Sequence, residues 1–160
     1  MCVINQKLKH MKKEQTIEAL NTLIEINNEG IQGYGIALKE TKEAYLKTLF
    51  FQLLYTAKKC KTELVSEVLQ LGGIPMEGTR TNSTFLNIWR DIKEAFTLKD
   101  YKKTLGLCEY MEVVTLATYN NVLKNKLQHS NSELQFILGE QHSLLKADHH
   151  RVKEMLLRQN

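Results

Sequence analysis

Apolar residues recur at alternating steps of three and four over most of this chain, which is the spacing that places side chains on one face of an α-helix. No stretch shows a persuasive alternation of apolar and polar residues that would indicate a β-strand. The pattern therefore predicts an all-α fold with four long helices. The predicted inward positions are Ile17, Leu20, Ile24, Asn27, Ile31, Tyr34 and Leu38; Leu46, Leu49, Leu53, Ala57, Cys60, Leu64, Val68 and Leu71; Tyr101, Leu105, Cys108, Glu112, Thr115, Tyr119 and Val122; and Leu134, Ile137, Leu138, Gln141, Leu145, Asp148, Val152 and Met155.

Turn and capping residues indicate where the first two helices begin and end. Thr16 is a suitable N-cap for the first helix, because its hydroxyl can accept from a free backbone N–H. The apolar stripe then loses phase at residues 41–44, and one helix from Thr16 to Leu71 would be about 84 Å long at 1.5 Å per residue. We therefore expect a tight turn at residues 41–44. Gly72 and Gly73 end the second helix.

A long connection separates the second long helix from the third. It contains a loop at residues 72–84, rich in glycine, and a short apolar segment at residues 85–96. We expect Trp89 and its neighbours to cover a groove or an end of the bundle. Asp100 is a plausible cap for the third long helix, which runs to about Gln128. A loop of this length can reach from one end of the bundle to the other, so we predict two helix pairs joined by a crossover that contains a short helix.

One acidic residue, Glu112, lies on the inward face of the third long helix. In a helical bundle, a buried carboxylate is where a metal ion or a hydrogen-bond network is found. In the first interpretation, Glu112 belongs to a polar layer that fixes the register of the helices. The expected members of this core polar network are Asn27, Tyr34, Glu112, Tyr119 and Gln141.

The second interpretation is a metal site. The di-metal centre of ferritin-like bundles needs a Glu-x-x-His pair from each of two helices, and the sequence contains no such pair. A complete centre is therefore not expected. A reduced site built from Glu112, His149 and Glu109 stays open as the alternative, and it would bind iron, manganese or zinc. Under the first interpretation no cofactor is expected.

The net charge of +4 comes mostly from the start of the chain, since residues 1–15 contain four lysines and one glutamate. These residues account for +3 and leave +1 for residues 16–160. We interpret residues 1–15 as a lysine-rich N-terminal tail that is poorly ordered, and residues 16–160 as a single four-helix-bundle domain. Because the folded part is nearly neutral, we expect no nucleic-acid partner.

Composition places the chain among ordinary helical proteins. With 160 residues, of which 42% are hydrophobic, it can bury a core without disulfides. Its three cysteines include no CxxC pair, which suits a reducing compartment. No apolar run approaches the roughly 20 residues of a membrane span, and the first 15 residues do not form a secretory signal. We therefore expect a cytoplasmic protein without a membrane partner.

Five segments of the sequence carry a resemblance to known proteins: LIEINNEGIQGY (23–34), LGGIPMEG (71–78), IWRDIKEAF (88–96), CEYMEVVTLATYNNVL (108–123) and QHSLLKADHHRV (141–152). Together they resemble a family of bacterial ferritin-like four-helix-bundle proteins of unknown function. In that family the third helix carries a Cys-Glu-x-x-Glu-Asp run, a Tyr follows two turns later, and the last helix holds a His-Asp pair. This chain keeps Glu109, Glu112, Tyr119 and His149, but it has Val113 in place of the Asp and a second histidine after His149.

The resemblance implies a ferritin-like four-helix bundle but no activity. Phosphate-binding glycine loops, nucleophile elbows and zinc motifs are missing from the sequence, so we expect no enzyme. Two functions remain. The first is association with a second copy or another protein, in a stress setting as analogy of fold suggests. The alternative is metal binding at the reduced carboxylate and histidine site.

Overall fold

The computed structural model describes residues 2–79, 86–127 and 130–159. Within these ranges the chain forms helices and no strand, so the predicted all-α bundle is confirmed. None of the described helices has the length and apolar run needed to span a membrane. The helices are α1 (Cys2–Glu40), α2 (Ala44–Gln70), α3 (Leu86–Thr97), α4 (Tyr101–Asn121), the π-helical turn η1 (Val122–Lys126) and α5 (Ser132–Leu157).

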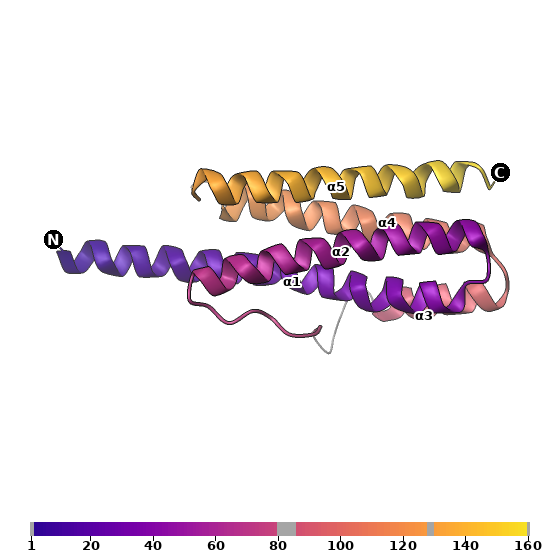
Figure 1. Ribbon diagram of the computed structural model, residues 1–160, viewed down its shortest axis with the longest axis horizontal. Coiled ribbons are helices and arrows are strands. Elements are labelled where there is room, and N and C mark those ends of the chain that lie inside the picture. The colour runs from indigo at the N-terminus through magenta and orange to yellow at the C-terminus, as the bar shows by residue number, and fades with distance from the viewer. Residues whose placement is uncertain (1, 80–85, 128–129, 160) are drawn as a thin grey trace.

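The four long helices lie side by side as two antiparallel pairs (Figure 1). Helix α1 pairs with α2 and α4 pairs with α5, and α2 also packs on α5. Residues 41–43 between α1 and α2 are not helical, which confirms the predicted turn. Because the crossover returns the chain along the bundle before α4 begins, α2 and α4 run in the same direction (Figure 1).

Two asparagines of α1 hold the first part of the crossover. The side chain of Asn21 donates to the carbonyl of Ile74 at 3.0 Å and accepts from the backbone N–H of Met76 at 2.8 Å. About two turns further along α1, the side-chain amide of Asn28 donates to the carbonyl of Gly78 at 2.8 Å. The chain therefore runs along α1 before α3 begins.

The helix ends follow local capping chemistry. The Asp100 carboxylate accepts from the backbone N–H of Lys103 at 3.1 Å, as predicted. Helix α2 ends at Gln70, and Gly72 takes a positive φ of 77°, a conformation that glycine adopts without steric cost. Phe85 and the predicted end of the third long helix at Gln128 lie outside the described residues.

The predicted start of the first helix at Thr16 is wrong, because α1 begins at Cys2. Residues 2–15, expected as a poorly ordered tail, are instead the first turns of α1. Lysine, glutamine and glutamate favour helices, and no glycine or proline interrupts this stretch. Thr16 does not cap anything; its hydroxyl donates to the Lys12 carbonyl at 2.9 Å inside the helix. We call residues 2–15 the N-terminal arm, which projects beyond the ends of α2, α4 and α5 (Figure 1).

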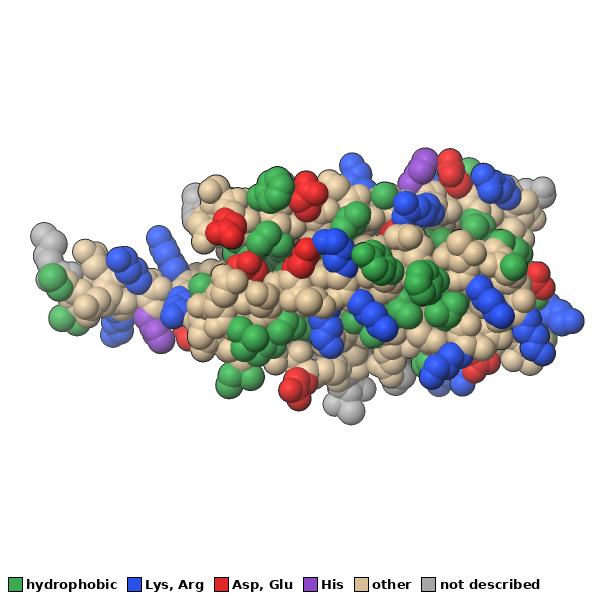
Figure 2. Space-filling view, viewed as in Figure 1, with side chains coloured by type: hydrophobic (Ala, Val, Ile, Leu, Met, Phe, Trp, Pro, Cys, Tyr) green, Lys and Arg blue, Asp and Glu red, His purple; other side chains and the backbone are tan. Residues whose placement is uncertain are grey.

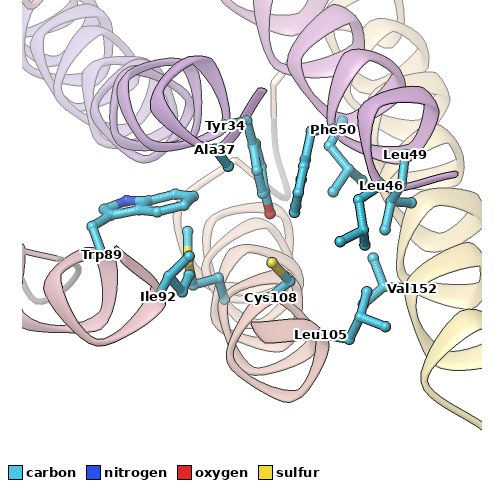
Figure 3. Close-up of a cluster of buried hydrophobic side chains, with 12 residues drawn as sticks. Tyr34, Ala37, Leu46, Leu49, Phe50, Trp89, Ile92, Leu105, Cys108 and Val152 are labelled. Carbon is cyan, nitrogen blue, oxygen red and sulfur yellow. The ribbon is translucent and has the colours of Figure 1, made fainter. Parts of the chain in front are cut away.

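Helix α3 packs against both α1 and α4, as expected if the segment around Trp89 covers part of the bundle. Figure 3 shows Trp89 and Ile92 reaching from α3 toward Tyr34 and Cys108. The rings of Trp89 and Tyr34 meet edge to face, with centroids 5.4 Å apart. The Trp89 ring occupies the space that a side chain on Gly33 would need, so this glycine permits the close approach of α3.

We predict opposite effects for two glycines of α1 that lie two residues apart. A Cβ on Gly33 would overlap the Trp89 ring, whereas a Cβ on Gly35 would meet no atom within 4 Å. Gly33→Ala is expected to lower the free energy of unfolding by about 1–3 kcal/mol through overpacking. Gly35→Ala is expected to raise it by roughly 0.5–1 kcal/mol, because alanine favours the helix. Urea denaturation of both variants measures this difference, and equal effects would contradict the packing of Trp89 on Gly33.

Candidate functional site

The core contains a chain of hydrogen bonds that links all four long helices, which we call the four-helix polar chain. The side-chain amide of Asn27, on α1, donates to the hydroxyl of Tyr119, on α4, at 2.9 Å. That hydroxyl donates to Oε1 of Gln141, on α5, at 2.8 Å. Nε2 of Gln141 then donates to two oxygens of α2, the Cys60 carbonyl at 3.2 Å and Glu63 Oε1 at 3.0 Å.

The four-helix polar chain ends in an ion pair near the surface. Lys59 Nζ lies 2.6 Å from Glu63 Oε2, and both side chains are more than a third exposed. Partial burial raises the pKa of the Glu63 carboxyl, but hydrogen bonds from Lys59 and Gln141 outweigh it and the pKa is lowered. Burial raises the pKa of the Tyr119 hydroxyl well above its usual value and that of the Cys60 thiol to about 12. The inner members of the chain are therefore neutral, and the charge lies at its solvent end.

Glu112 forms a second polar contact in the core, with Tyr34 of α1. The Tyr34 hydroxyl donates to Glu112 Oε1, and both side chains are buried. Glu112 Oε2 is also buried, and among the described residues it has no hydrogen-bond partner. Burial raises the pKa of the Glu112 carboxyl to about 8; the Tyr34 hydrogen bond opposes this shift and the charge of Asp148 adds to it. At neutral pH this carboxyl is therefore mostly protonated.

Asp148 of α5 is a buried acid that the sequence places on the inward stripe but that we did not include among the candidates. Its side chain is 2% exposed, and Oδ1 accepts from Arg151 at 2.7 Å. Thr56 and Gln52 of α2 also hydrogen-bond to it. Burial raises the pKa of the Asp148 carboxyl, against the effect of Thr56 and Arg151. The signal that could have identified it is the one that identified Glu112, an acid at an apolar position of a helical stripe.

The three candidate metal ligands do not share one environment. His149 Nε2 lies 3.5 Å from Glu109 Oε1, and these side chains are 24% and 27% exposed. Glu112 is instead paired with Tyr34 in the core. Across the part of the chain that the structure describes, no group of three or more His, Cys, Asp or Glu side chains is arranged to hold a metal ion. The structure therefore brings together Glu109 and His149 as a pair.

The predicted polar network divides into two separate contacts. Glu112 bonds to Tyr34, whereas Asn27 and Gln141 bond to Tyr119. Glu63 and the Cys60 carbonyl complete the four-helix polar chain, although the sequence pattern does not include them in the network. A neutral, hydrogen-bonded interior of this kind orients helices, and its thiols are poor nucleophiles because burial raises the pKa of the Cys108 thiol as well.

Glu112 is expected to give the protein a pH-dependent stability. The folded pKa of about 8 lies above the ordinary value of 4.5, so the folded state holds an extra proton between these pH values. The free energy of unfolding should therefore fall as pH rises from 4.5 to 8, by on the order of 3 kcal/mol. Glu112→Gln keeps an acceptor for Tyr34 but cannot ionise, so its stability should fall less over this range.

Urea denaturation of both proteins at several pH values in this window measures the difference in slope. Glu140→Gln is the matched control, because Glu140 is an exposed glutamate on α5. It should keep the wild-type slope. Identical slopes for wild type and Glu112→Gln would contradict the protonated state of Glu112.

One comparison with known proteins places the chain in a family. A family model described as "Domain of unknown function (DUF2383)" matches residues 15–125, which hold most of α1 and all of α2, α3 and α4. The match includes Tyr34, Glu112 and Tyr119 and ends before Gln141. No curated protein and no solved structure matches the chain significantly. Since the family model covers more than half of the sequence, the chain belongs to the DUF2383 family, a domain of unknown function.

Proposed function

We propose that this protein is a ferritin-like helical bundle of the cytoplasm that has no enzymatic activity and acts through association with a second copy of itself or with another protein. The crossover between two antiparallel helix pairs supports the ferritin-like assignment, because ferritin-like bundles have one such connection. The polar core groups support a structural interior, since they are largely hydrogen-bonded to one another. By analogy of fold alone, a stress setting is the proposed context.

The observation that favours association is a pair of exposed aromatic residues on the outer face of α2. Phe51 and Tyr55 lie one helical turn apart and are 62% and 58% exposed. Lys47, Lys58 and Lys59 lie within one turn on either side of them and are exposed. Hydrophobic side chains gather over α2 among lysines on the face that Figure 2 shows. Exposed aromatics with a charged rim are typical of protein interfaces, in which tyrosine is enriched.

Association through this α2 aromatic face, made of Phe51 and Tyr55, is testable with purified protein. Sedimentation velocity from micromolar to millimolar concentration should show that the wild-type mass increases with concentration. Phe51→Glu/Tyr55→Glu should weaken association by roughly 30-fold or more, because both carboxylates would have to be desolvated in the interface. Phe136→Glu is the matched control, since Phe136 is 68% exposed but lies near the start of α5. A wild-type protein that stays monomeric would refute self-association and leave another protein as the partner.

The alternative function is metal binding at a reduced site. Its support is the 3.5 Å distance between His149 Nε2 and Glu109 Oε1, which are two ligand types that iron, manganese and zinc accept. Glu112 lies one turn from Glu109 on the same helix and would have to leave Tyr34 to join them.

Elemental analysis distinguishes the two functions. The protein is purified after growth with added iron, manganese or zinc, and then analysed together with Glu112→Ala and His149→Ala. The association proposal predicts well under one ion per chain for all three proteins. One ion per wild-type chain, lost in both variants, would establish the alternative instead.

A further inference from the structure

The N-terminal arm exposes an apolar stripe that the rest of the molecule does not cover. All side chains of residues 2–15 are exposed. Four of them are large and apolar, with exposed fractions of 74% for Val3, 65% for Ile4, and 51% for both Leu8 and Met11. Figure 2 shows hydrophobic side chains and lysines together on this projecting part of α1. Isolated exposed apolar residues are ordinary, but these four follow one another on a single short stretch of helix.

Helical geometry places three of the four apolar residues on one side, with lysines at the borders of this side. With about 100° of rotation per residue, Ile4, Leu8 and Met11 fall within an arc of roughly 60°. Lys7 and Lys12 lie on the two sides of this arc. An apolar stripe bordered by lysines is typical of helices that lie in a membrane interface, where the lysine stems extend the apolar surface and the ammonium groups reach the headgroups.

The stripe also faces away from the bundle. The core side of α1, which carries Leu20, Ile24 and Asn27, lies roughly opposite the stripe on the helix. A flat surface against the arm would therefore not collide with α2, α4 or α5, which pack on the other side of α1. Helix α3 does pack on the stripe side, at Gly33, but this residue is 22 positions beyond Met11, or about 33 Å further along α1. Directly after the arm, the outer side of α1 carries the exposed polar residues Glu18 and Thr22, and further along it is covered where Trp89 packs on Gly33, so the exposed stripe is confined to the arm.

We propose that the N-terminal arm binds reversibly to the surface of an anionic lipid bilayer, with its apolar stripe at the headgroup boundary and the bundle held above it. Charge complementarity selects this partner: residues 2–15 carry four lysines and one glutamate, so two arms packed together would repel each other, whereas anionic headgroups attract both. The cytoplasmic leaflet offers such headgroups. From the sequence we expected no membrane partner and interpreted residues 1–15 as a poorly ordered tail. The apolar stripe forms only because residues 2–15 are helical.

Vesicle co-sedimentation of the full-length protein tests this proposal. Vesicles of pure phosphatidylcholine are compared with vesicles that contain phosphatidylglycerol. We expect binding to the anionic vesicles alone, weakened by added salt. Ile4→Glu/Leu8→Glu should reduce the partition coefficient at least roughly tenfold, because it replaces two of the three apolar residues in the arc with charges. Lys7→Gln/Lys12→Gln should reduce it about fivefold for each lysine.

Leu98→Glu is the matched control, because Leu98 is 68% exposed and lies between α3 and α4, far from the arm. It should bind as the wild type does, and circular dichroism checks that all variants stay helical. Equal binding to both vesicle types, no binding to either, or binding that the arm variants leave unchanged would each overturn the proposal. Pairing of the arm with a second copy would also overturn the proposal. It would be seen as an oligomeric mass in solution that falls to the monomer mass in Ile4→Glu/Leu8→Glu, while the wild type does not bind vesicles.

Discussion

A phenol hydroxyl buried among four helices loses its water and must find its partners within the protein. Tyr119 does so by accepting from Asn27 and donating to Gln141, which in turn reaches the carbonyl of Cys60 and the carboxylate of Glu63. Apolar side chains tolerate sliding, whereas these bonds do not: a shift of one helix by one turn, about 5.4 Å, would break them. The axial register of the four helices relative to one another depends on these hydrogen bonds.

The two polar contacts of the core handle charge differently. In the four-helix polar chain the charge is on Glu63, where Lys59 and solvent stabilise it. Within the described residues the Glu112 carboxyl bonds to the Tyr34 hydroxyl alone; it is buried and lies near the charge of Asp148, so the folded protein keeps it mostly protonated at neutral pH. Protonation therefore makes burial of the Glu112 carboxyl tolerable, whereas the buried Asp148 carboxyl is paired with Arg151.

Sequence patterns predicted the helices better than their partners. Periodicity located four helices and the turn at residues 41–43, because burial imposes a regular spacing on each helix separately. It also indicated that Glu112 faces the core. It could not show that Tyr119, and not Glu112, bonds to Asn27 and Gln141, since this depends on the axial offset between helices. The arm was missed, although Ile4, Leu8 and Met11 have helical spacing, because its lysines suggested a solvated tail and Thr16 offered an N-cap.

The contact between Gly33 and Trp89 has a consequence for how related chains can diverge. The indole ring fills space that any side chain at position 33 would claim, so the two positions share one volume between them. A larger residue at 33 becomes acceptable only where position 89 has already become smaller. In related chains, a larger residue at position 33 should therefore occur together with a smaller residue at position 89. Such paired substitutions would indicate that α3 packs on α1 in those chains as well.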